Sequence, residues 1–266
     1  MTEGSGEPQG GAPVGRGPLA GLLVADFSRV LAGPFATMLL GDLGADVVKV
    51  EHPDGGDETR AWGPPFHGEH STYYLAVNRN KRSVALDLKD EQGRRAALAL
   101  AGRADVLVEN FKAGALERLG LGFEELRQDN PRLVWCSISG FGREAGAELP
   151  GYDFLVQAMS GLMSITGPPG GEPTKVGVAL VDVLTGLYAF GGVLAALRER
   201  DRTGGGQRVE VSLLGSALAS LVNQASSYLC TGRPPRAMGN RHPSITPYET
   251  LATADRPLVV AVGNDG

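Results

Sequence analysis

Short apolar runs alternate with amphipathic stretches along most of the chain. Residues 22–27 form an apolar run typical of a strand, residues 34–44 a mostly apolar helical stretch that ends at glycine, and residues 45–51 a second strand. A strand, a turn, a helix and a strand within about 30 residues make a βαβ unit, whose strands are expected to be parallel and whose crossover right-handed.

The same alternation continues to about residue 230. Further strands are predicted at 83–88, 105–110, 133–139 and 207–213. A helical turn is predicted within 71–77, and helices are predicted at 91–103, 115–130 (two short ones), 152–167, 182–200 and 217–230. Alternating strands and helices of this length predict an α/β fold with a doubly wound, Rossmann-like parallel sheet.

Three segments lack this alternation. Residues 1–18 are rich in Gly and Pro without an apolar stretch, which predicts a disordered tail and no signal peptide. Residues 52–71 are dense in Gly, Pro and charge, and long loops of this kind are usually functional or disordered. Residues 231–266 begin with a Pro- and Arg-rich loop and end in a predicted strand at 256–266.

Composition narrows the class of protein. The 266 residues are 42% hydrophobic and carry a formal net charge of −5 without a basic block, so nucleic acid and anionic membranes are not expected partners. The two cysteines, Cys136 and Cys230, make neither a disulfide framework nor a metal-ligand set, which favours a reducing, cytoplasmic setting. No apolar run reaches membrane-spanning length, and no metal site is predicted from the spacing of the four histidines.

Three places offer weak signals for a phosphorylated nucleotide. The first βα junction, at 30–34, has small residues and Pro at a helix N-terminus, which favours an anion. A plain strand–helix turn is the commoner explanation of this spacing. The turn NRNKRS at 78–83 gathers Arg79, Lys81 and Arg82, either for phosphates or as a solvated surface turn. Lys112 and Arg118 follow a strand, where α/β sheets bind ligands.

Asp182 lies among apolar and small residues at the start of a predicted helix. Aspartate is a preferred N-cap, and that role is the commoner explanation. The alternative is a nucleophile that the helix N-terminus and backbone N–H donors keep ionised beside an apolar wall. The sequence contains no GxGxxG, Walker, GxSxG or zinc motif that would indicate another chemistry.

Long stretches of the chain resemble the family III coenzyme A transferases. They include DFSRVLAGPFATMLLGDLGADVVKVE, GDETRAWGPP, YYLAVNRNKRSVALDLK, ADVLVENFKAGALERLGLG, GYDFLVQAMSGLMSITG and VALVDVLTGLYAFGGVLAAL. GDETRAWGPPF and STYYLAVNRNKRS are most similar to the succinyl-CoA:dicarboxylate branch, which includes glutarate transferases. The resemblance implies a coenzyme A-binding and catalytic large domain at 19–230, with a linker and the start of a small domain at 231–266. It also implies a C-terminally truncated chain and, at full length, an interlocked homodimer.

The resemblance assigns roles to individual residues. The family's nucleophile falls on Asp182. Positions that contact coenzyme A in relatives fall on Leu31, Ala32, His52, Leu86, Lys89, Asn110, Phe111, Lys112 and Arg118. The residues expected to meet a substrate carboxylate are Arg60, Tyr152, Arg241, His242 and Ser244. His52 stands where the formyl-CoA enzyme has arginine, and His242 and Ser244 stand where that enzyme has a glycine-rich loop.

The implied reaction begins with attack of Asp182 on a donor thioester, giving an aspartyl acyl anhydride and coenzyme A thiolate. Coenzyme A enters as substrate, and no permanently bound cofactor is expected. The related racemases share the scaffold but carry a histidine where this chain has Tyr152, and tyrosine is a weak base near pH 7. A non-catalytic coenzyme A-binding fragment stays open as an alternative, and a dinucleotide oxidoreductase is disfavoured because the glycine fingerprint is missing.

Overall fold

A single parallel sheet forms the centre of the molecule. The computed structural model describes residues 16–264. Its six-stranded sheet has the order β5-β2-β1-β6-β7-β8, with every pairing parallel. The strands are β1 (Leu23–Asp26), β2 (Asp46–Glu51), β5 (Lys81–Ala85), β6 (Val106–Glu109), β7 (Val134–Ser139) and β8 (Arg208–Ser212). The order runs outward in both directions from β1 and β6, which confirms the predicted Rossmann-like fold.

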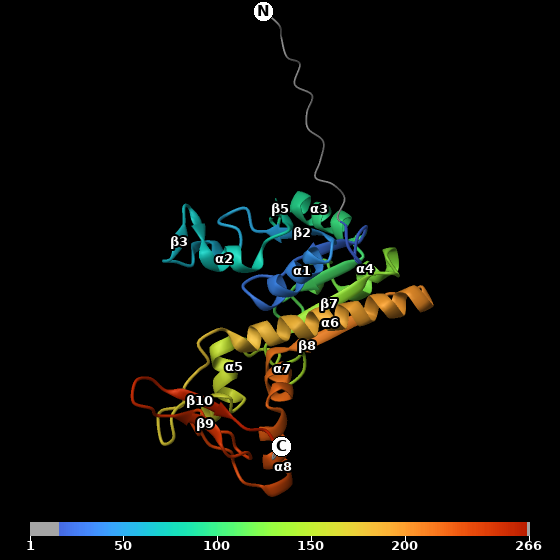
Figure 1. Ribbon diagram of the computed structural model, residues 1–266. Coiled ribbons are helices and arrows are strands. Elements are labelled where there is room, and N and C mark those ends of the chain that lie inside the picture. Colours follow the sequence, from blue (N-terminus) through green and yellow to red (C-terminus); the bar gives the residue numbers. More distant parts are fainter. Residues whose placement is uncertain (1–15, 265–266) are drawn as a thin grey trace, which may run out of the picture.

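Helices cover both faces of this sheet (Figure 1). The helices of the described residues are α1 (Ala32–Asp42), α2 (Thr72–Val77), α3 (Glu91–Ala101), α4 (Phe123–Asp129), α5 (Asp153–Met159), α6 (Leu180–Thr203), α7 (Leu213–Ser220) and α8 (Val222–Thr231). Of these, α1 and α6 pack on one face of the sheet and α3 and α4 on the other. Single 3-10 turns occur at Glu58–Ala61, Glu117–Leu119 and Met163–Ile165. Short hairpins pair β3 (Phe66–His67) with β4 (His70–Ser71) and β9 (Tyr248–Leu251) with β10 (Leu258–Ala261).

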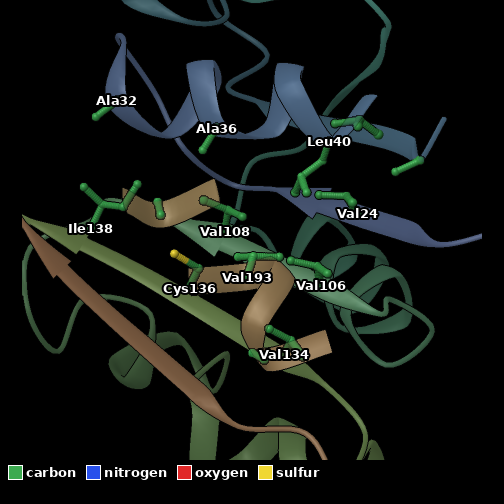
Figure 2. Packing of buried hydrophobic residues seen from close by; sticks show 14 of the residues in the cluster. Val24, Ala32, Ala36, Leu40, Val106, Val108, Val134, Cys136, Ile138 and Val193 are labelled. Carbon is green, nitrogen blue, oxygen red and sulfur yellow. The ribbon is translucent and has the colours of Figure 1, made fainter. Parts of the chain in front are cut away.

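Successive residues of the central strands enter different cores. Val106 and Val108 pack with α1 and α6, whereas Leu107 between them packs with α3 and α4. Figure 2 shows the first of these cores, in which Ala36 and Leu40 of α1 lie over the strands. Since side chains alternate along a strand, burial on both faces requires the nearly continuous apolar runs that the sequence shows.

The contact between α1 and α6 depends on a glycine. A Cβ atom at Gly186 would lie 2.8 Å from the carbonyl oxygen of Ala32 and 2.9 Å from Cδ1 of Phe35. We expect Gly186→Ala to push the helices apart and to lower the free energy of unfolding by about 1–3 kcal/mol. Urea unfolding measures this, with Gly191→Ala as the matched control on the same helix. No atom lies within 4 Å of a Cβ built at Gly191, so that variant should gain up to about 1 kcal/mol. Equal effects would contradict the steric explanation.

Several element boundaries differ from the prediction. The expected strand at 83–88 is β5 at 81–85, because Lys81 and Arg82 pair with β2 residues. The expected helix at 152–167 ends at Met159, before Gly161 with φ +86°. The expected helix at 217–230 is two helices that begin at 213 and break at Leu221. The loop at 52–71 contains a 3-10 turn and a hairpin, and β9 was not predicted.

Two further expectations concern α6 and the chain start. Among the residues described, α6 is long and apolar enough to cross a membrane by length and composition, so the expectation that no run reaches this length was wrong. In the structure this helix packs on α1, β7 and β8, with Ala189, Val193 and Ala196 fully buried. Most of the predicted tail, residues 1–15, lies outside the described residues, and residues 16–18 precede the buried Leu19.

Candidate active site

A cavity of about 230 Å³ lies at the carboxyl ends of the central strands. Its walls come from the turns after β1 and β6, the end of β7, the loop that leads to Tyr152, and Asp182 at the start of α6. The sheet order changes direction between β1 and β6, and ligands of open α/β sheets bind in the crevice at this point. The predicted nucleophile and the first predicted anion-binding turn therefore share one cavity.

The two central turns are hydrogen-bonded to each other. The backbone N–H of Arg29 donates to Oδ1 of Asn110 at 2.9 Å, and Nδ2 of Asn110 donates to the carbonyl oxygen of Arg29 at 2.8 Å. The Arg29 guanidinium lies 5.5 Å from the centre of the Phe111 ring. Asn110 thus fixes the turn after β6 against the turn after β1.

A second cavity, of about 170 Å³, adjoins the first. Arg29 and Phe111 line both. The second cavity is also lined by residues at the end of β2 and by residues that follow β2 and β5, among them His52, Leu86 and Lys89. Together the two cavities form a trough along the carboxyl edge of the sheet.

Asp182 is not an N-cap. The helix α6 begins at Leu180 with Ala179 in the cap position, so Asp182 is in the first turn, and the N-cap interpretation was wrong. The carboxylate that binds this helix end belongs to Asp153 of α5. Its Oδ1 accepts hydrogen bonds from the backbone N–H groups of Val181 at 2.8 Å and of Asp182 at 3.3 Å. Asp153, and not the side chain of Asp182, therefore caps this helix.

The environment of Asp182 disfavours its charge. Burial, followed by the nearby Asp153 carboxylate, raises the pKa of Asp182 to about 7. The protonated form is therefore more favourable here than in an ordinary aspartate. This corrects the expectation that the backbone N–H donors at the helix N-terminus keep Asp182 ionised, because those donors bind Asp153. Within residues 16–264, no group donates a hydrogen bond to the Asp182 carboxylate oxygens. Such a carboxylate, when ionised, is poorly hydrated and nucleophilic.

The residues predicted to contact coenzyme A fall largely on the trough. Leu31, Ala32, Asn110, Phe111 and Lys112 line the first cavity. His52, Leu86 and Lys89, together with Phe111, line the second. Arg118 lines neither, although its guanidinium lies 3.1 Å from the Cβ position of Gly114 in the wall of the first. The structure places most of these residues at one edge of the sheet. Their roles in binding coenzyme A stay predictions.

The basic turn at 78–83 does not form a phosphate cluster. Arg79 pairs with Asp42 at 2.5 Å, and Arg82 pairs with Asp46 at 2.5 Å. Lys81 is buried and pairs with Asp26 at 3.0 Å. Each cation has a carboxylate partner in the chain. Arg79 and Arg82 are exposed, as the interpretation as a surface turn predicts, whereas that interpretation was wrong for the buried Lys81.

The residues predicted to meet a substrate carboxylate are dispersed. Tyr152 lines the first cavity with Asp182. Arg60 lines neither cavity: its Nη2 pairs with Glu51 at 2.7 Å and its guanidinium lies 3.9 Å from the centre of the Tyr74 ring. Arg241, His242 and Ser244 also line neither, and Nδ1 of His242 accepts from the Ser244 N–H at 3.0 Å. The roles of these last three stay predictions.

Sequence reasoning missed Asp153 and the buried pair Lys49–Asp57. Asp153 directly follows Tyr152 in the motif GYD, so the motif could have indicated it. Lys49 interrupts the apolar run of β2, and a lysine at a buried strand position signals a paired charge. No cluster of three or more His, Cys, Asp or Glu residues suited to a metal ion occurs in the described part of the chain.

Comparison with known proteins fits this architecture. Residues 19–266 match CoA-transferase family III, and the chain belongs to this family. It is 51% identical over 256 residues to a succinate–glutarate CoA-transferase of Agrobacterium fabrum, covering 94% of this chain and 64% of that protein. It is 48% identical to the succinyl-CoA:glutarate CoA-transferase of Mus musculus, covering 93% of this chain and 57% of that protein. The chain thus spans roughly six-tenths of the length of these relatives.

A solved structure shows the same fold. A CAIB/BAIF family protein from Brucella suis superposes with a TM-score of 0.87 at 48% sequence identity. The match covers 94% of this chain and 67% of the Brucella suis chain.

Proposed function

We propose that this chain carries the coenzyme A-binding and nucleophilic part of a CoA-transferase. Coenzyme A would move from an acyl-CoA donor, succinyl-CoA, to a dicarboxylate acceptor such as glutarate. The observation that carries the proposal is Asp182: a carboxylate with a raised pKa, without a hydrogen-bond donor among the residues described, in the cavity at the sheet's switch point. The substrates of the relatives support the choice of donor and acceptor.

The first half-reaction needs only the ionised Asp182. One carboxylate oxygen attacks the thioester carbonyl carbon, the C–S bond breaks, and coenzyme A leaves as a thiolate with the electron pair. The product is a mixed anhydride between Asp182 and the acyl group. Covalent catalysis of this kind divides one difficult exchange into easier steps. Burial supports the step because it withholds water from both the nucleophile and the anhydride.

The second half-reaction regenerates the aspartate. The acceptor carboxylate attacks the aspartyl carbonyl carbon and releases the donor acid. A second anhydride, between Asp182 and the acceptor, results. The coenzyme A thiolate then attacks the acceptor's acyl carbon, which forms the new thioester and frees the Asp182 carboxylate. No proton is lost or gained over the cycle.

The trough supplies the binding part of the proposal. Lys112 and the N-terminus of α1 after Leu31 both line the first cavity, and together they favour phosphate groups. Coenzyme A acts as substrate here, with no resident cofactor in the scheme. The proposal extends to a cytoplasmic enzyme that forms a homodimer at full length, with neither nucleic acid nor membrane as partner.

A test mixes the purified chain with succinyl-CoA and a panel of dicarboxylates that includes glutarate, malate and itaconate. Mass spectrometry detects new acyl-CoA. We expect exchange with wild type and with Asp201→Asn, a control at the exposed end of the same helix. Exchange that persists in Asp182→Asn would overturn the mechanism. Coenzyme A binding by the folded wild-type chain without exchange would instead favour a binding fragment.

A further inference from the structure

One residue of the cavity wall has an unfavourable backbone conformation. Val30 has φ +69°, in the left-handed region, where branched side chains are rare. It lies between Arg29 and Leu31 in the turn after β1 and lines the cavity that contains Asp182. Strain of this kind persists only where the surrounding structure holds it in place.

A buried ion pair holds this turn from both sides. Nζ of Lys49 lies 2.9 Å from Oδ2 of Asp57, and both side chains are at most 1% exposed. The Lys49 Nζ also donates to the carbonyl oxygen of Ser28 at 2.8 Å. The Asp57 carboxylate accepts from the backbone N–H of Val30, with its Oδ2 at 3.3 Å and its Oδ1 at 3.5 Å. The two partners of one pair thus bind the backbone on either side of Arg29.

Asp57 is itself fixed in orientation. Its Oδ1 accepts from the backbone N–H of Thr59 at 3.0 Å and from the Thr59 hydroxyl at 2.8 Å. Its own backbone N–H donates to Oε1 of Glu51 at 3.0 Å. Asp57 lies in the loop that follows β2, so the contact joins a distant segment to the turn after β1.

We propose that Asp57, held by Lys49, is a positioning residue for the cavity wall. Its carboxylate keeps Val30 left-handed, and Val30 in turn sets where Leu31 and Ala32 face Asp182. The expected effect on acyl exchange rests on the function proposed above. The effect of Asp57 on the backbone conformation of Val30 does not. Lys49 and Asp57 line the second cavity and Val30 lines the first, so the pair also connects the walls of the two.

The test uses the chain with Asp57→Asn, alone and combined with Val30→Gly. Glycine adopts the left-handed conformation without strain, so it should need the carboxylate less. The matched control is Arg200→Met, which breaks the ion pair at 2.9 Å between the buried Arg200 and the partly exposed Asp105 at the opposite end of the sheet. Unfolding in urea measures the stability that each variant loses.

We expect Asp57→Asn to lower kcat for acyl exchange by about 10- to 100-fold, because small misplacements of a reacting group cost this much. Arg200→Met should change kcat less than about threefold at a similar loss of stability. Adding Val30→Gly to Asp57→Asn should restore kcat at least about fivefold without restoring stability. Equal kcat in Asp57→Asn and Arg200→Met, or no recovery with Val30→Gly, would overturn the proposal.

A second readout is independent of exchange. Amide hydrogen exchange over residues 29–32 should be at least about tenfold faster in Asp57→Asn and unchanged in Arg200→Met. If the wild-type chain transfers no acyl group, the proposed function has failed and this readout alone decides the positioning role. Unchanged amide exchange in Asp57→Asn would refute it.

Discussion

Replacing Asp182 with asparagine is expected to abolish acyl exchange, by at least about 10³-fold, while it raises the free energy of unfolding at pH 8. The activity falls because an amide cannot attack the thioester and form the anhydride. Stability rises because the partly buried carboxylate beside Asp153 no longer has to ionise. A rise of the pKa from its ordinary 3.8 to about 7 corresponds to a gain of up to about 4 kcal/mol.

The sign of the pH dependence follows from proton binding. Between pH 3.8 and about 7 the folded state binds more protons at Asp182 than the unfolded state does. Stability of the wild type therefore falls as pH rises through this range. The Asp182→Asn variant does not lose stability in this way. The free energies of unfolding of the two proteins should therefore be similar near pH 4 and differ most above pH 7.

Urea unfolding of both proteins from pH 4 to 8 measures the difference. Asp201→Asn serves as the control on the same helix and should follow the wild type. A destabilised Asp182→Asn at pH 8 would show that the carboxylate is structurally required, as a cap would be. That result would contradict the poorly solvated nucleophile.

Replacing Asp26 with asparagine is expected to destabilise the protein, in contrast to Asp182→Asn. The free energy of unfolding should fall by about 3–5 kcal/mol. The Asp26 carboxylate is fully buried and accepts from Lys81 at 3.0 Å, from Thr37 at 2.7 Å and from the Ser28 hydroxyl at 2.5 Å. An asparagine would leave the buried Lys81 ammonium without its counter-charge. Breaking one partner of a buried pair is costly for that reason.

The same measurement over pH separates this effect from simple loss of packing. Burial alone would raise the pKa of Asp26, but Lys81 and Lys49, with hydrogen bonds from Ser28 and Thr37, lower it to about 2. The stabilisation is complete above pH 4 and is lost as pH falls toward 2. Asp46→Asn removes a solvent-exposed pair with Arg82 on the same sheet and should cost less than about 1 kcal/mol. Similar losses in both variants would contradict the role of burial.

The sheet could be predicted because its information is local. Val106, Leu107 and Val108 are apolar in succession, which is what burial on two faces demands. Asn110 and Arg29 are in contact although they are 81 positions apart in the sequence. The order of the strands likewise depends on residues far apart, so no local pattern reveals it. The resemblance to a known family supplied Asp182 as nucleophile, whereas the pattern alone favoured a cap.

Charged residues were the hardest to place from the sequence. The sequence predicts an exposed basic turn at Lys81 and Arg82. In the structure both residues belong to β5, where Arg82 pairs with Asp46 of β2 and Lys81 pairs with Asp26 of β1. The pKa of Asp182 could not be predicted from the sequence, because it depends on burial in the folded chain and on Asp153 from another helix. Tertiary contacts join residues that are far apart in the sequence, so they cannot be inferred from a local pattern as apolar periodicity can.

The wall shared by the two cavities bears on how a long ligand would be held. Arg29 and Phe111 belong to both, so a molecule anchored in one presents its other end to the second at a high effective concentration. Each end of the ligand then increases the overall affinity, even where its own affinity for one cavity is weak. The trough is therefore suited to a bipartite ligand, and truncation of either end should weaken binding by more than the lost contacts alone.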